Sequence, residues 1–65
     1  MQVKTELITL QNLLKITGLV NSGGEAKQII LSGLVKVNNH VELARSKKLY
    51  PGDKVEYNGE FIEII

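Results

Sequence analysis

Apolar residues recur at helical spacing in the first third of the chain. Leu10, Leu13 and Leu14 fall on one face of a helix about two turns long. Thr9 precedes them and has the side-chain oxygen that an N-cap requires, and Gly18 follows where a helix of this length ends. The pattern predicts a first helix that depends on packing of its leucine face, because so short a helix is marginal by itself.

A second helix is predicted to start at Ser22. Glu25 stands three residues later, the spacing of a capping box in which each side chain accepts from the other residue's amide. Gly33 stops the helix, since glycine adopts a positive φ without strain. The apolar face of this helix comprises Ala26, Ile29 and Ile30. The short connection from Gly18 to Ser22 favours a helix–turn–helix-like hairpin.

The rest of the chain alternates apolar and polar residues, which is strand spacing. Residues 1–6 show a weak form of this pattern and predict an edge strand. Residues 44–48 are polar and basic and are predicted to form a loop. The alternating apolar positions are Val35 and Val37, then Val41 and Leu43, then Val55 and Tyr57, and finally Phe61, Ile62, Ile64 and Ile65.

Three dipeptides predict tight turns between these strands: Asn38-Asn39, Pro51-Gly52 and Asn58-Gly59. A two-residue turn at Asn58-Gly59 sets Tyr57 opposite Glu60, Val55 opposite Ile62 and Lys54 opposite Glu63. The predicted fold is α+β, with two short helices packed on a small, mostly antiparallel sheet. We expect residues 1–65 to form a single domain, because so short a chain supports only one core.

Composition narrows the class of protein. The chain is 43% hydrophobic, as is usual for a folded domain, and it has no cysteine, so it has neither disulfides nor thiolate metal sites. It contains no run of 18 apolar residues and no signal-peptide pattern at its start. We therefore expect a cytoplasmic protein with no membrane contact.

Charge is distributed unevenly, although the net charge is only +1. Residues 27–54 carry six cations against two carboxylates, a net of +4, whereas residues 55–65 carry three glutamates and no cation. One interpretation is a positive face on a nearly neutral body, and the other is an ordinary solvated surface of mixed charge.

No catalytic constellation is present. The one histidine, His40, follows a turn and is more typical of a surface residue than of a ligand or base. The serines lack a nucleophile-elbow context, and Gly23-Gly24 is not followed by the Gly-Lys-Ser/Thr of a phosphate loop. We predict a protein that is not an enzyme and that binds no metal, cofactor or small-molecule substrate.

Binding residues are predicted at the start of the second helix and in the basic middle of the chain. The free amides of Gly23 and Gly24 attract anions, although a plain cap with Glu25 on the same amides is the alternative interpretation. Tyr57 and Phe61 are more typical of core or sheet-face residues than of base-stacking platforms. The candidate phosphate-binding cations are Lys27, Lys36, Arg45, Lys47 and Lys48.

These elements together resemble the S4 RNA-binding domain family, also called the alpha-L RNA-binding motif. The resemblance covers about residues 9–57 and is similar to small stand-alone bacterial members with a Ser-Gly-Gly-Glu-Ala-Lys segment, here residues 22–27. Gly23 stands where the family often has arginine, and Thr9-Leu10-Gln11 stands where it often has Arg-Leu-Asp. The matching positions are Ser22, Gly23, Ala26, Ile29, Ile30, Gly33, Val35, Val37, Asn38 and Asn39, preceded by Leu10, Leu13, Leu14, Gly18 and Leu19 and followed by Gly52, Asp53 and Val55.

The resemblance implies an RNA-binding module that recognises structured RNA, ribosomal or transfer RNA, and associates with the ribosome. The departures at Gly23 and at residues 9–11 imply either weaker binding or a shift of phosphate contact to Lys27, Lys36 and the Arg45–Lys48 loop. A rival hypothesis is a small protein-interaction adaptor that pairs through the edge of its C-terminal strand. The predicted RNA-binding residues are Ser22, Gly23, Gly24, Lys27, Lys36, Asn38, Arg45, Lys47 and Lys48.

Overall fold

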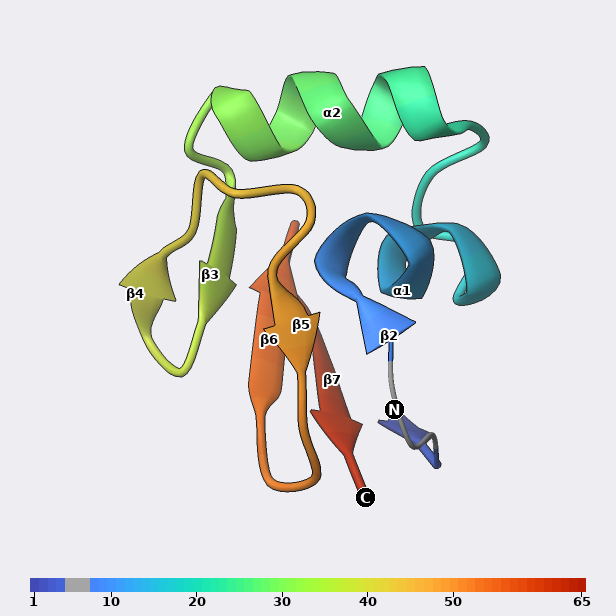
Figure 1. Ribbon diagram of the computed structural model, residues 1–65, viewed down its shortest axis with the longest axis vertical. Coiled ribbons are helices and arrows are strands. Elements are labelled where there is room, and N and C mark those ends of the chain that lie inside the picture. Colours follow the sequence, from blue (N-terminus) through green and yellow to red (C-terminus); the bar gives the residue numbers. More distant parts are fainter. Residues whose placement is uncertain (5–7) are drawn as a thin grey trace.

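The computed structural model describes residues 1–4 and 8–65, and it shows the α+β fold that the sequence predicts (Figure 1). Helix α1 spans Leu10–Ile16 and helix α2 spans Gly23–Leu31. The strands are β1 (Gln2–Val3), β2 (Ile8–Thr9), β3 (Val35–Val37), β4 (His40–Val41), β5 (Lys48–Leu49), β6 (Lys54–Tyr57) and β7 (Glu60–Ile64). Residues 5 and 6 of the predicted first strand lie outside the described residues.

Both helices begin at the predicted caps. The Thr9 hydroxyl accepts a hydrogen bond from the backbone N–H of Asn12 at 3.3 Å, and the Ser22 hydroxyl accepts one from the backbone N–H of Glu25 at 3.2 Å. The glycines after the two helices have φ angles of 78° at Gly18 and 77° at Gly33, a conformation that other residues adopt only with strain. Local sequence signals therefore determine where the helices begin and end.

The main sheet has the strand order β1-β7-β6-β3-β4, and all its pairings are antiparallel except that of β1 with β7. The predicted register of the last hairpin is confirmed: Lys54 pairs with Glu63, Val55 with Ile62 and Tyr57 with Glu60. Strand β7 has β6 on one side and β1 on the other. The edge through which the rival adaptor hypothesis pairs the C-terminal strand with a partner is therefore already occupied by the N-terminal strand at Glu63 and Ile64.

A second, two-stranded sheet pairs β2 with β5, which the sequence did not predict. Ile8 lies opposite Leu49, and Thr9 lies opposite Lys48. Lys48 was expected in a loop but is the first residue of β5. The pairing joins residues about 40 positions apart, and two-residue strands leave too little alternation to detect in a sequence.

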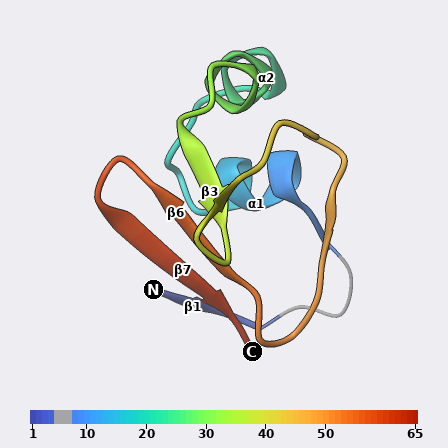
Figure 2. The same cartoon turned by 90° about the vertical axis from the view of Figure 1, so that its left-hand side faces the viewer.

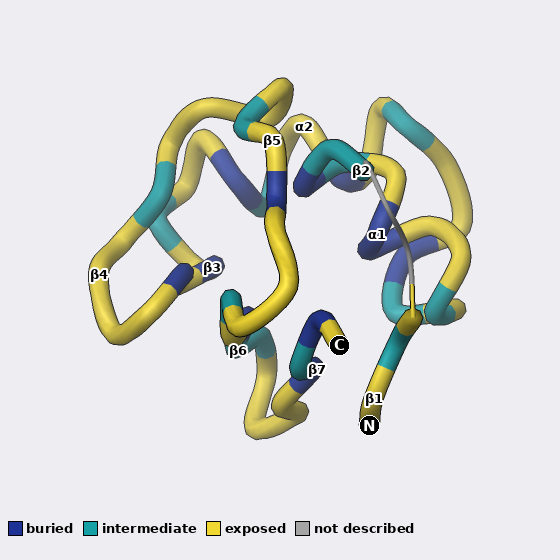
Figure 3. The backbone as a smooth tube through the Cα atoms, turned by 60° about the horizontal axis from the view of Figure 1, so that its bottom comes forward, coloured by how far each residue is buried: buried dark blue, intermediate teal, exposed yellow. Residues whose placement is uncertain are grey.

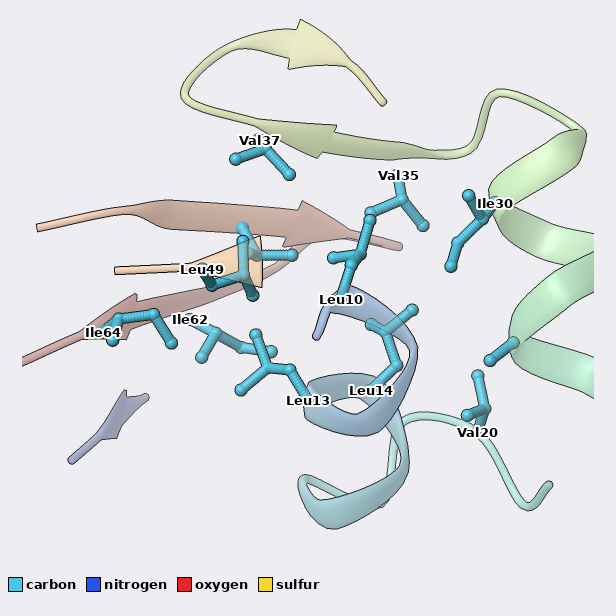
Figure 4. Close-up of a cluster of buried hydrophobic side chains, with 12 residues drawn as sticks. Leu10, Leu13, Leu14, Val20, Ile30, Val35, Val37, Leu49, Ile62 and Ile64 are labelled. Atoms are coloured by element: carbon cyan, nitrogen blue, oxygen red, sulfur yellow. The ribbon is translucent and has the colours of Figure 1, made fainter. Parts of the chain in front are cut away.

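The hydrophobic core lies between the two helices, one face of the main sheet and β5 (Figure 3, Figure 4). Val41 and Leu43, which were predicted to alternate in a strand, are instead about half exposed, at 52% and 54%, and pairing in β4 ends at Val41. Their hairpin extends past the edge of the core. The buried residues are Leu10, Leu13, Leu14, Val20, Ala26, Ile30, Val35, Val37, Leu49, Val55, Ile62 and Ile64.

Candidate nucleic-acid interface

The start of α2 is open to solvent. Ser22 is exposed and its hydroxyl accepts from Glu25, while the Ser22 carbonyl accepts from Ala26 at 3.1 Å. Gly24 is exposed and Gly23 is half-buried. The described residues do not form the return bond from the Ser22 amide to the Glu25 carboxylate, so only one half of the capping box is made. The helix start is thus exposed at Ser22 and Gly24 and partly covered at Gly23, and anion contact requires exposed amides of this kind.

Gln11 joins the start of α2 to the basic loop. Its amide nitrogen Nε2 lies 2.7 Å from the point where a Cβ on Gly23 would stand, so a larger residue at position 23 would displace the end of the Gln11 side chain. The backbone N–H of Gln11 donates to the Arg45 carbonyl at 3.0 Å. The N-terminal turns of both helices and Arg45 thus meet at one place. Nothing in the sequence pattern predicted this contact, although Gln11 and Gly23 both stand where the sequence departs from the family pattern.

The basic segment 45–48 is held to α1 by its backbone. The Leu10 N–H donates to the Lys47 carbonyl at 2.9 Å, and Lys48 pairs with Thr9 between β5 and β2. Buried Leu49 anchors the far end. Figure 1 shows this segment passing below α2 and beside the start of α1. Main-chain hydrogen bonds thus fix the position of segment 45–48. The cationic side chains of Arg45 and Lys48 are exposed there, and that of Lys47 is half-buried.

Lys27 lies one helical turn after Gly23 and is exposed. Arg45 and Lys48 are exposed and Lys47 is half-buried, and all three lie on the segment whose backbone is bound to β2 and the start of α1. Among residues 1–4 and 8–65, no side-chain hydrogen bond uses the head group of these four residues. We call the set Gly23, Gly24, Lys27, Arg45, Lys47 and Lys48 the basic face.

Lys36 lies apart from the basic face. Val35 and Val37 on either side of it point into the core, so Lys36 extends from the outer face of the main sheet, where its cross-strand partners are Val41 and Glu56. Figure 2 shows the main sheet on one side of the core and the chain leading to β5 on the other. The sequence placed Lys36 with the other cations because its strand spacing does not reveal which way the sheet faces.

Asn38 has a structural role in this fold. Its φ is 52°, its Nδ2 donates to Asp53 Oδ1 at 3.1 Å, and its Oδ1 accepts from the Lys54 N–H at 3.0 Å. Asp53 Oδ2 in turn accepts from the Tyr50 N–H at 2.8 Å. Asn38 therefore ties the β3–β4 turn to the Pro51-Gly52 turn, a role distinct from the RNA contact that the motif match suggested.

Metal-binding clusters and membrane-spanning helices are two other features on which a function can depend. In the part of the chain that the structure describes, no cluster of three or more His, Cys, Asp or Glu is placed to hold a metal ion, and neither helix has the length and apolarity to cross a membrane. The family model described as "S4 domain" matches residues 1–65. The chain belongs to the S4 domain family, as the sequence predicted, and proteins of this class are non-catalytic binders.

Two curated proteins are similar over most of their length. The "Probable ribosome maturation protein RlbA" of Bacillus subtilis is 42% identical over 57 residues, covering 88% of this chain and 80% of RlbA. The "Putative RNA-binding protein YbcJ" of Escherichia coli is 34% identical over 58 residues, covering 89% of this chain and 83% of YbcJ. Both are small proteins of about the same size as this one.

Two solved structures share the fold. The solution structure of Escherichia coli YbcJ, described as having an "alfaL motif involved in RNA-binding", superposes with a TM-score of 0.72 at 29% identity, covering 98% of this chain and 85% of YbcJ. The 30S ribosomal protein S4e of Thermoplasma acidophilum gives a TM-score of 0.63 at 26% identity, covering 88% of this chain and 30% of S4e. In S4e the same fold thus forms part of a longer protein.

Proposed function

We propose that this protein binds structured RNA through the basic face and that its target is ribosomal RNA. The observation that carries the proposal is the backbone attachment of Arg45 and Lys47 to the start of α1, from which the Gln11 side chain reaches Gly23 at the start of α2. Phosphate contact requires cations that are solvent-accessible and unengaged, and backbone amides that a phosphate oxygen can approach. The basic face offers both.

Ribosomal RNA is favoured over transfer RNA by the relatives. RlbA is named as a probable ribosome maturation protein, and YbcJ is named as a putative RNA-binding protein. We infer that this chain acts on the ribosome or on its precursors, which places it in the cytoplasm. A rigid face of about four cations suits a folded RNA, whose phosphates are held at fixed positions, better than a flexible single strand.

A salt titration tests the proposal. If Lys27, Arg45, Lys47 and Lys48 each neutralise one phosphate, the logarithm of the affinity for a ribosomal RNA hairpin falls with the logarithm of salt concentration at a slope of about −3 to −4. Fluorescence anisotropy with a labelled hairpin gives the slope. A flat salt response, or no binding at low salt, contradicts the proposal.

A charge-matched pair of variants separates this face from general electrostatics. K47E/K48E reverses two charges on the basic face, whereas K4E/K15E reverses two exposed lysines elsewhere, so both variants have the same net charge. We expect K47E/K48E to weaken hairpin binding strongly and K4E/K15E to weaken it only slightly. Equal losses would show that net charge alone governs binding.

A further inference from the structure

The Phe61 side chain is exposed and lies outside the basic face. It is 62% exposed as the second residue of β7, although the strand buries Ile62 and Ile64 on its other face. A single exposed apolar side chain is ordinary in a folded domain. The exposed ring therefore points to a function only through the groups and the space around it.

The surroundings of Phe61 are polar and charged. Strand register places Glu56 directly opposite Phe61, and Lys36 directly opposite Glu56, all on the outer face of the main sheet. Lys54 lies opposite Glu63 on the same face, two residues before Glu56 in β6. Neighbouring strands are about 4.8 Å apart, so Lys36 stands about 10 Å from Phe61. The ring therefore lies beside charged side chains on β6, with exposed Met1 as its apolar neighbour on the other side.

Two hollows flank this ring. The larger has a volume of about 450 Å³, and the second has a volume of about 400 Å³. Phe61 and Lys54 line both of them. The walls of the larger hollow also include Asn39 at the β3–β4 turn and Glu56 on β6. Volumes of this size accept a group as large as a nucleoside.

We propose that this outer sheet face, comprising Phe61, Lys54, Lys36 and Glu56, is a second RNA contact that takes an unpaired nucleotide. The base stacks on the Phe61 ring, and its phosphate binds Lys54 or Lys36. Base stacking needs an exposed ring with free space beside it, and phosphate binding needs a cation within the length of one nucleotide. The register and the hollows supply both conditions.

Charge and shape favour a nucleotide over a protein partner here. A protein interface concentrates several apolar side chains at its centre and excludes charge from it. On this face, charged residues occupy the positions next to Phe61 on β6. The Glu56 carboxylate is an acceptor that suits the amino edge of a base and repels a phosphate, so the phosphate is expected on the lysines.

The proposal rests on the RNA-binding function proposed above and extends it. The basic face would hold the folded part of the RNA, and the outer sheet face would hold a single-stranded segment next to it. Lys36, which lies apart from the basic face, then has a phosphate to bind. Target sites would be helices flanked by unpaired nucleotides.

A tailed hairpin tests the second contact. Wild-type protein is titrated with one hairpin and with the same hairpin carrying a short single-stranded tail, and the ratio of the two affinities measures the contribution of the tail. We expect F61A to reduce binding of the tailed hairpin by about 5- to 100-fold, since stacking on an aromatic ring contributes on that order. Binding of the hairpin without a tail should not change.

L31A is the matched control, because Leu31 is 58% exposed but lies on α2, away from the outer sheet face. It should leave both affinities unchanged. Circular dichroism before each titration verifies that the variants are folded. If F61A leaves the affinity ratio of the two hairpins at the wild-type value, the proposal is wrong.

A second measurement does not depend on the basic face. The chain has no tryptophan, so F61W introduces one reporter at the proposed stacking position. Short single-stranded oligonucleotides should quench its fluorescence in both the F61W and the F61W/K47E/K48E backgrounds. Absence of quenching would show that the proposed stacking site is wrong. A wild-type dimer that the F61A substitution dissociates would show the same, because Phe61 would then belong to a protein interface. Failure of the untailed hairpin to bind instead refutes the function proposed for the basic face.

Discussion

The side chain of Gln11 occupies the space in which a Cβ of residue 23 would lie, with its Nε2 atom 2.7 Å from that point. This contact joins α1 to the first turn of α2. The contact gives a steric explanation for glycine at position 23. The backbone conformation does not explain it, because the φ angle of Gly23 is not positive. A Cβ at position 23 would displace the end of the Gln11 side chain, so the two residues should depend on each other energetically.

We therefore predict that the effect of G23A depends on residue 11. Replacing a helical glycine by alanine normally stabilises a protein by about 0.4–1 kcal/mol. In the Q11A background, where the space is free, G23A should show this gain. In the wild-type background, the Gln11 amide must move and the gain should be reduced or lost. Urea denaturation of the four proteins measures the coupling, and equal effects in both backgrounds would contradict it.

The Ser22 cap should stabilise α2 measurably. The Ser22 hydroxyl accepts from the Glu25 N–H, so S22A removes the partner of one helix-terminal amide. We expect a loss of about 1 kcal/mol in the free energy of unfolding, and only a few tenths for S22G. Ser32 at the other end of α2 is a control, because the structure shows no side-chain hydrogen bond for it. S32A should change stability by less than about 0.5 kcal/mol.

Asn38 and Asn39 should respond differently to the same substitution. Both have positive φ angles, 52° and 71°, which glycine also adopts. N38G removes the bonds to Asp53 and Lys54 and should cost about 1–2 kcal/mol, since each net hydrogen bond contributes roughly 0.5–1.5 kcal/mol. N39G keeps the turn and should be near neutral. Thermal and urea unfolding of the two variants give the comparison, and similar losses would show that Asn38 has no special role.

Lys36 and Lys48 should differ in their effect on hairpin binding. Lys48 belongs to the basic face, whereas Lys36 extends from the outer sheet face beside Glu56. With an untailed RNA hairpin, we expect K48A to weaken binding several-fold and to reduce the salt slope by about 1, and K36A to change neither. Anisotropy titrations at three salt concentrations measure both quantities. An equal loss for K36A would place Lys36 in contact with the hairpin.

The elements that the sequence predicted are those with local causes. Thr9 and Ser22 cap their helices through residues three positions away, and the turn at Asn58-Gly59 sets the register of its own hairpin. Each of these signals lies within a few residues, so reading the chain in order is sufficient to find it. The fold class and the family followed from such signals in combination.

The features that the sequence did not predict depend on distant residues. The pairing of Thr9 with Lys48, the packing of Gln11 on Gly23 and the bond from Asn38 to Asp53 each join separate elements. The alternation of Lys36 with Val35 and Val37 predicts that the lysine lies on the sheet face away from the core. Which surface of the molecule that face belongs to depends on which side of the sheet the helices cover. Phe61 was expected to be a core or sheet-face residue, and the fold places it on the outer face.

The pairing of β1 with β7 affects the order in which parts of the molecule fold and locally unfold. Gln2 and Glu63 are backbone partners 61 residues apart, so forming this contact restrains nearly the whole polypeptide at once. The entropic cost of closing so large a loop is not offset until the rest of the sheet exists, so β1 should be added late in folding. In hydrogen exchange, the N–H of Ile65, which bonds to the Val3 carbonyl, should lose protection well before that of Val55 in the central strand.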